Sequence, residues 1–215
     1  MDFVAKMMSK YGEKMLTLTI EHLVMCLIGV LLAILIGVPL GVIMTKNERV
    51  AVIIQTVTNV IQTIPSIALL LMIMVVFGLG IGTAITALFC YSLLPVIQNT
   101  YSGLKTVDKS LIEAGKGMGM TNLQLLSMVQ LPLAMPVLIA GIRVAMVVSV
   151  GVATIASFVG AGGLGDLILR GIATVDDMKI FAGAIPAALL AILADFILDI
   201  VERRMGIRTH TARRT

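Results

Sequence analysis

Charged residues are scarce in this 215-residue chain, at 13% of the total, whereas hydrophobic residues make up 59%. An ordinary soluble domain has about 25% charged and about 45–50% apolar residues, so this composition excludes that class of protein. The apolar residues form several runs of the ~20 positions that an α-helix needs to cross ~30 Å of hydrocarbon. We therefore expect an all-α integral membrane protein that forms one compact domain in the lipid bilayer.

Cysteine and histidine are also scarce, with two of each, and tryptophan is absent. Cys26 and Cys90 both lie in apolar runs, so we interpret them as small buried side chains and expect neither a disulfide nor a metal site. His22 and His210 fall on opposite sides of the expected membrane, which excludes a Ser–His protease or a His-metal enzyme. We expect no catalytic residue and no cofactor. The net charge of +4 comes from basic residues beside apolar runs, so no nucleic-acid partner is expected either.

The apolar runs predict five transmembrane helices within a membrane domain over residues 20–202. They cover about residues 23–44, 50–77, 81–102, 133–157 and 180–201. Pro65 interrupts the second helix, and Pro95 lies inside the third. Residues 1–19 place apolar side chains at helical spacing with lysines on another face, which predicts an amphipathic arm in the membrane interface. No cleavable signal peptide is apparent, so the first span is expected to direct insertion.

Basic residues predict the orientation of these helices. Ten Lys and Arg residues lie on the side that holds the loop 103–132 and the tail 203–215, and five lie on the other side. The positive-inside rule then places the loop and the C-terminus in the cytoplasm and the N-terminus outside. The three lysines of the arm oppose this assignment. The basic tail suits an anionic inner leaflet, although a plain stop-transfer anchor is the simpler interpretation.

The main polar interruption runs from Glu113 to Pro132, EAGKGMGMTNLQLLSMVQLP. Its first residues favour a helix, and its three glycines let another backbone approach closely. Thr121 and Gln124 have the spacing of a capping box, which marks the start of a second helix. We predict a short helix, a glycine-rich turn and another helix that form a rigid knob on the membrane surface. The alternative is a solvated loop.

This stretch resembles the cytoplasmic loop of binding-protein-dependent ABC importer permeases. Their pattern is Glu-Ala-Ala, three residues, Gly, nine residues, Ile, one residue, Leu-Pro, and this chain differs by Gly115 for the second Ala and Val129 for Ile. The resemblance implies a coupling helix that sits in a groove of a cytoplasmic ATPase subunit. It assigns this coupling to Glu113, Ala114, Gly115, Gly119, Leu131 and Pro132. Because the chain has no GxxxxGK[ST] string, we expect another polypeptide to hydrolyse ATP.

Two further segments extend the resemblance to most of the chain. IQTIPS at residues 61–66 is similar to permease subunits of importers for glycine betaine, carnitine and choline, and SFVGAGGLG at residues 157–165 to those for methionine and compatible solutes. The resemblance implies ATP-driven uptake of a compatible solute, with a second permease subunit, identical or paralogous, and an extracytoplasmic solute-binding protein. The alternatives are an importer for an amino acid or an ergothioneine-like betaine, or a stand-alone channel or ion-coupled carrier.

The glycines of the segment at residues 160–165 also match the GxGxxG string of dinucleotide-binding proteins. That fingerprint requires a preceding strand and an acidic residue about 20 positions later. Here a membrane helix precedes the glycines, and Asp177 comes too early. We interpret the segment instead as a re-entrant turn between the last two spans.

Polar residues recur on one face of two of the expected spans. The second span carries Gln55, Asn59, Gln62 and Ser66, and the third carries Tyr91, Pro95, Gln98 and Ser102. These faces are predicted to line a solute pathway or, alternatively, to form interhelical hydrogen bonds worth about 1 kcal/mol each. Tyr91 and Tyr101 are about 80° and ~15 Å apart on one helix, too far to form an aromatic cage around one quaternary ammonium. Solute selection is therefore expected to reside mainly in the binding protein.

Charged residues within the expected spans need a partner, because an isolated charge in the membrane costs several kcal/mol. Arg143 lies in the fourth span, and Asp195 and Asp199 share a face of the fifth. We predict an ion pair between Arg143 and Asp195. A proton relay is the alternative, but the chain has no further acidic residue deep enough to extend one.

Overall fold

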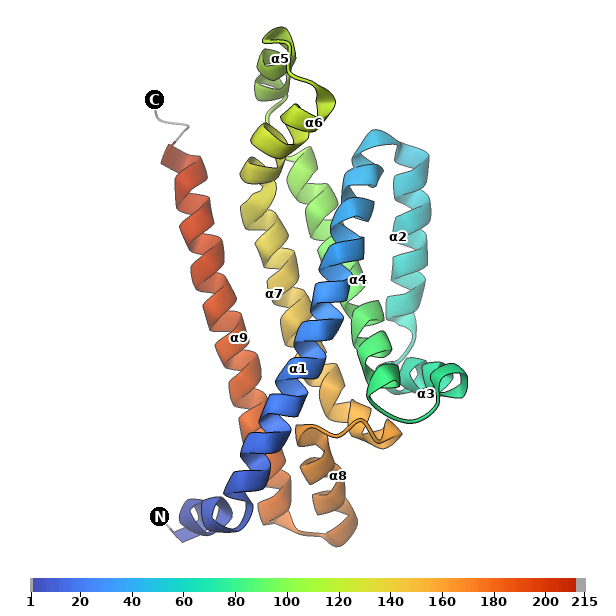
Figure 1. Ribbon diagram of the computed structural model, residues 1–215, viewed down its shortest axis with the longest axis vertical. Helices are drawn as coiled ribbons and strands as arrows, with labels where there is room; N and C mark the ends of the chain where they lie inside the picture. Colours follow the sequence, from blue (N-terminus) through green and yellow to red (C-terminus); the bar gives the residue numbers. More distant parts are fainter. Residues whose placement is uncertain (1, 212–215) are drawn as a thin grey trace.

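The computed structural model describes residues 2–211, and all regular secondary structure in that range is helical (Figure 1). The α-helices are α1 (Asp2–Lys46), α2 (Glu48–Thr63), α3 (Ser66–Phe77), α4 (Ile81–Lys105), α5 (Lys109–Gly117), α6 (Asn122–Gln124), α7 (Leu131–Ile155), α8 (Leu164–Thr174) and α9 (Asp177–Thr211). A π-helical turn, η1 (Leu125–Gln130), precedes α7, and a 3-10 turn, η2 (Ala156–Val159), follows it. Four of the described helices, α1, α4, α7 with its flanking turns, and α9, are long and apolar enough to cross a membrane, and the bent pair α2–α3 counts as a fifth if it is one span. The predicted all-α membrane architecture is confirmed.

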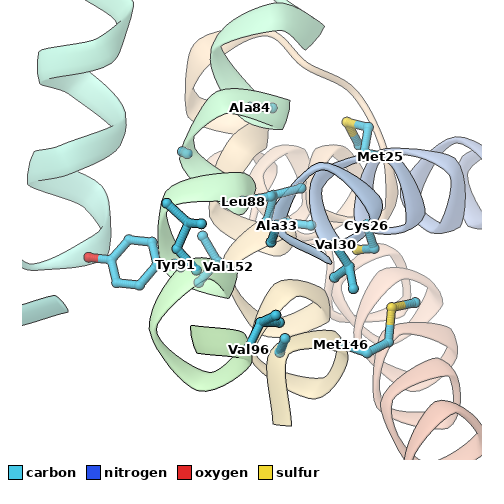
Figure 2. Packing of buried hydrophobic residues seen from close by; sticks show 14 of the residues in the cluster. Met25, Cys26, Val30, Ala33, Ala84, Leu88, Tyr91, Val96, Met146 and Val152 are labelled. Atoms are coloured by element: carbon cyan, nitrogen blue, oxygen red, sulfur yellow. The ribbon is translucent and has the colours of Figure 1, made fainter. Parts of the chain in front are cut away.

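Small residues let α1, α4 and α7 pack closely in the centre of the molecule. A Cβ atom on Gly29 of α1 would lie 2.7 Å from the Cβ of Leu88 on α4, and one on Gly41 would lie 2.6 Å from that of Thr100. On α7, a Cβ on Gly141 would lie 2.7 Å from the carbonyl oxygen of Pro95. Close approach of this kind is the main source of helix association in membranes, where the lipid is as apolar as the side chains. Figure 2 shows the Met, Val, Leu and Ala side chains of the three helices that fill the core between them.

The N-terminal arm is part of α1, because the helix runs without a break through the predicted boundary at residues 19 and 20. Figure 1 shows its first turns lying at an angle to the rest of α1. Met7, Met15 and Leu18 are buried against residues of α8 and α9, so the arm packs on its own chain. The Tyr11 hydroxyl donates a hydrogen bond of 2.9 Å to Asp176, in the turn between α8 and α9. This bond lowers the pKa of the Asp176 carboxyl, with a further contribution from the backbone N–H of Lys179.

The predicted second span is divided at Pro65 into α2 and α3, which meet at an angle of 100°. Proline lacks a backbone N–H and forces the residue before it out of helical geometry. Ile64 accordingly has extended dihedral angles, φ −71° and ψ 126°. The prediction placed the interruption correctly, but residues 50–77 do not form one straight helix.

The glycine-rich segment after α7 forms a turn, in which Gly160, Gly162 and Gly163 all have positive φ. The turn leads into α8, a helix that the sequence interpretation did not include. A Cβ atom on Gly183 of α9 would lie 2.7 Å from the carbonyl oxygen of Leu164, so α8 and α9 are in close contact. The N-terminus lies at this end of the molecule, whereas α5, α6 and the end of α9 lie at the other (Figure 1).

Candidate functional site

One candidate site is the projection formed by α5, α6 and η1, residues 109–130, which we call the coupling knob (Figure 1). Asp108 caps α5 by accepting a hydrogen bond of 2.9 Å from the backbone N–H of Ser110. Glu113 and Ala114 are exposed on α5. Four large apolar side chains of the knob are also exposed: Leu111 at 46%, Met118 at 76%, Leu123 at 73% and Met128 at 68%. The knob therefore presents an apolar surface with an acidic residue beside it.

The turn inside the knob is fixed by backbone hydrogen bonds. Gly119 has φ +79°, a conformation that only glycine adopts readily. The N–H of Met120 donates to the carbonyl of Gly115 at 3.1 Å, and that of Gly119 to Lys116 at 3.0 Å, which together form a Schellman motif. Thr121 and Gln124 then form the predicted capping box. The structure thus contains the helix, glycine turn and second helix expected from the sequence.

The other residues predicted to take part in coupling lie inside the knob (Gly115) and where the knob meets α7 (Leu131 and Pro132). Gly115 is buried, and a Cβ atom there would lie 2.7 Å from Cδ1 of Leu125. Leu131 and Pro132 form the first turn of α7. Leu131 packs against an apolar cluster that includes Leu104 of α4. A movement of the knob would therefore be transmitted to both α4 and α7.

The second candidate site is a cavity of about 530 Å³ between the α2–α3 bend, α4 and α7, which we call the polar cavity. Its lining consists of polar and apolar residues from these three regions. They are Gln62, Thr63, Ile64, Pro65, Ser66, Tyr91, Leu94, Pro95, Gln98, Asn99, Val144, Val148 and Val152. No formal charge lies among these described residues.

Pro95 explains why Gln62 points toward α4. A proline inside a helix has no N–H for the carbonyl four residues before it, which here is that of Tyr91. The Gln62 side-chain amide fills this place by donating a hydrogen bond of 2.9 Å to the Tyr91 oxygen. In return, the Tyr91 hydroxyl donates to the carbonyl of Ile64 at the α2–α3 bend. In Figure 2 the Tyr91 ring points away from the other labelled core residues.

The predicted pathway residues divide into two groups in the structure. Gln62, Ser66, Tyr91 and Gln98 all line the polar cavity. Asn59 lies beside it and accepts a hydrogen bond of 3.4 Å from Gln98, whereas Gln55 is not part of the lining. Gln62 and Tyr91 therefore both join helices and line the cavity, and a solute pathway along this cavity stays a prediction.

Asn99 is a lining residue that the sequence interpretation missed. Its side-chain amide donates a hydrogen bond of 2.8 Å to the carbonyl of Pro95. A polar residue four positions after a proline in an apolar helix is the signal that could have identified it.

Arg143 on α7 is surrounded by carboxylates from α9. Two of its nitrogens donate to Asp195, at 2.5 and 3.1 Å. A third contact of 2.8 Å reaches Asp199, and a weaker one of 3.4 Å reaches Glu202. The structure places the predicted pair in contact and adds two acidic residues to it. The neighbouring Val144 lines the polar cavity, whereas the Arg143 side chain contacts α9 on another side of the helix.

The family model for "Binding-protein-dependent transport system inner membrane component" matches residues 16–207. The chain belongs to this family. The permease is 48% identical over 199 residues to the glycine betaine/carnitine/choline transport system permease protein OpuCD of Bacillus subtilis. The aligned residues cover 92% of this chain and 87% of OpuCD. It is 42% identical over 216 residues to the osmoprotectant import permease protein OsmW of Salmonella typhimurium, covering 97% of this chain and 100% of OsmW. A solved structure of the MetNI methionine ABC transporter in an inward-facing form matches with a TM-score of 0.80 and 25% identity, over 89% of this chain and 95% of the compared chain.

Membership of this family establishes what kind of subunit the permease is. It is a multi-pass inner membrane component of an ABC importer, in which the ATPase is a partner subunit and a binding protein delivers the solute. Among the described residues, no group of three or more His, Cys, Asp and Glu side chains is placed to hold a metal ion.

Proposed function

We propose that this permease translocates glycine betaine, carnitine, choline or a similar compatible solute into the cell. The identity of 48% with OpuCD over 92% of the chain is the observation that carries this proposal. The segment at residues 61–66, which led to the same solute class from the sequence, forms the α2–α3 bend and contributes five residues to the polar cavity. The alternative, an importer for an amino acid, has in its favour the fold shared with the methionine transporter.

The coupling knob is the surface on which the ATPase would act. Met118 and Leu123 are exposed apolar side chains, and burying them in a groove of the ATPase would stabilise the complex. Glu113 and Ala114 are exposed on α5 of the same knob. When the ATPase closes on ATP, the knob moves, and Leu131 at its base carries the motion into α7. Because α4 and α7 both line the polar cavity, the same motion changes the width of the pathway.

The polar cavity would form one wall of a pathway completed by a second permease subunit, identical or paralogous. Its lining residues come from only α2, α3, α4 and α7. The coupling knob and the end of α9 lie together at one end of the molecule, and the N-terminus lies at the other (Figure 1). With ten of the fifteen Lys and Arg residues outside the predicted spans assigned to the knob side, the C-terminus would lie in the cytoplasm and the N-terminus outside.

Uptake by the reconstituted transporter tests the solute assignment. The permease, its partner permease, the ATPase and the binding protein are placed in proteoliposomes, and uptake and ATP hydrolysis are measured with a panel of solutes. We expect glycine betaine, carnitine or choline to be taken up and to stimulate ATP hydrolysis, and methionine to do neither. Stimulation by methionine or another amino acid, without stimulation by the methylated ammonium solutes, would refute the proposal.

A further inference from the structure

The amide side chains of the polar cavity share one orientation. Gln62 donates through its nitrogen to the carbonyl of Tyr91, and Asn99 donates through its nitrogen to the carbonyl of Pro95. Gln98 likewise donates through its nitrogen to the side-chain oxygen of Asn59. In each case the nitrogen faces a protein oxygen. The amide oxygen, which is the negative end of the amide dipole, is therefore not used in these hydrogen bonds.

The hydroxyl groups of the lining follow the same rule. The Tyr91 hydroxyl gives its hydrogen to the Ile64 carbonyl, and Thr63 gives its hydrogen to Val60 at 2.7 Å. Their oxygens keep lone pairs but no hydrogen for a ligand. Ser66 is the one hydroxyl residue of the described lining for which no hydrogen bond is shown. The Tyr91 and Thr63 hydroxyls thus offer a ligand only acceptor lone pairs, and each lining amide offers its oxygen together with one remaining N–H.

The rest of the cavity wall is apolar. Val144, Val148 and Val152 form one side of it from α7, and Leu94 contributes from α4. An anionic group would find no cationic side chain here, and only neutral amide and hydroxyl donors would offset its desolvation. A methylated ammonium group has a positive charge, no N–H to satisfy and an apolar methyl surface. Amide oxygens and valine methyl groups together match that chemistry.

We infer that the polar cavity is a transient binding site for the methylated ammonium group of the solute. Gln62, Gln98 and Asn99 are the residues that make this site selective for a positive charge. The inference rests on the proposed function and adds which end of the solute the cavity recognises. The solute's carboxylate, where it has one, plays no part in this recognition. The cavity therefore passes a cation such as choline as readily as a zwitterion such as glycine betaine.

A fixed positive charge in the cavity tests the inference. In Gln98→Lys, the ammonium group repels choline, which has a net charge of +1, more strongly than glycine betaine, whose carboxylate offsets the repulsion. Two charges about 6 Å apart at an effective dielectric constant of about 40 change an equilibrium about tenfold. We expect uptake of choline to fall about tenfold more than uptake of glycine betaine.

Gln98→Met is the matched control, because it keeps the length of the side chain without a charge. It is expected to lower uptake of both solutes by the same factor. Both solutes are measured on the same proteoliposomes, so incomplete assembly cancels in the ratio of the two rates. The pair Val148→Lys and Val148→Met repeats the comparison from α7, where no hydrogen bond is lost if the Gln98 variants fail to assemble.

The outcomes separate this inference from the proposed function. If the wild-type transporter takes up neither choline nor glycine betaine, the proposed function fails. If it takes up both, and the lysine variants at both positions leave the ratio of the two rates unchanged, the inference about the cavity is wrong. A selective loss of choline uptake in the lysine variants alone supports it.

Discussion

The hydrogen bonds that shape the coupling knob join residues three to five positions apart, as between Met120 and Gly115 or between Thr121 and Gln124. Those that connect the walls of the polar cavity join residues 27 to 39 positions apart, as between Gln62 and Tyr91. The knob is therefore a local structure that needs little of the remaining fold, and the cavity exists only when α2, α4 and α7 are packed together. A substitution in the knob should impair coupling to the ATPase, whereas one that disrupts the packing of these helices should impair folding.

The largest loss of stability is expected where a long-range contact holds charges in the membrane. Arg143→Ala leaves Asp195 and Glu202 without a cationic partner, whereas Asp199 keeps its contact with Arg203. A carboxylate that loses its only partner within a membrane domain is destabilising. We expect a marked fall in the melting temperature of the purified permease. Combining it with Asp195→Asn should recover part of the loss, because the double variant removes one of the stranded charges. Strictly additive effects of the two substitutions would count against the pair.

A substitution at the contact between α4 and α7 should give the next largest loss of stability. In Gly141→Ala, the new methyl group would lie 2.7 Å from the Pro95 carbonyl oxygen, and backbone atoms cannot move aside as a side chain can. Overpacking of this kind costs about 1–3 kcal/mol. Gly151→Ala on the same helix is the control, since nothing lies within 4 Å of its Cβ position. Denaturant titrations should give a lower free energy of unfolding for Gly141→Ala than for Gly151→Ala. Equal values would show that α4 and α7 are not closely packed at Gly141.

A smaller and more local effect is expected in the knob. Gly119→Ala forces a left-handed conformation on alanine, which costs about 1–2 kcal/mol and disturbs the path of the chain into α6. Gly117→Ala is the control, because Gly117 has no positive φ and no neighbour within 4 Å. Gly119→Ala should weaken stimulation of the ATPase while the membrane helices remain folded. Full coupling in this variant would mean that the turn geometry is unimportant.

The smallest effect concerns the N-terminal end of α1, where the pKa of Asp176 is lowered chiefly by the Tyr11 hydroxyl. A carboxyl with a lowered folded-state pKa stabilises the protein above its unfolded pKa of about 3.9, and this contribution disappears as the pH falls through the folded-state value. In Tyr11→Phe, the acid-side loss of stability should be shallower than in the wild type. Melting curves measured from about pH 5 down to well below the unfolded pKa of about 3.9 follow this loss, and identical profiles would exclude a role for this bond.

The same difference between local and long-range structure explains what the sequence could predict. The helix, glycine turn and capping box of the knob follow from residues close together in the chain, and the structure contains all of them. The 100° bend at Pro65 was placed correctly because proline acts on its own neighbours. The hydrogen bond that joins the bend to α4, between the Tyr91 hydroxyl and the Ile64 carbonyl, is one that no local pattern reveals.

Helix α8 and the packing of the N-terminal arm were missed for a related reason. The glycines before α8 were interpreted as a turn, and the eleven-residue helix after them is too short to register as a membrane span. The apolar face of the arm was assigned to the membrane interface, but Met7 and Met15 are buried against α8 and α9. The sequence showed that the arm has an apolar face, and only the tertiary structure shows what covers it.

The most direct test of the account is whether the knob and the cavity can be impaired separately. Glu113→Lys and Gln98→Met are compared in the assembled transporter for retention of the ATPase, basal ATP hydrolysis and solute uptake. Because Glu113 is exposed, we expect Glu113→Lys to leave the permease folded but to abolish co-purification of the ATPase. Gln98→Met should keep the ATPase bound and basally active while solute uptake falls. Wild-type uptake and full retention of the ATPase in Glu113→Lys would contradict the claim that the motor acts through the knob.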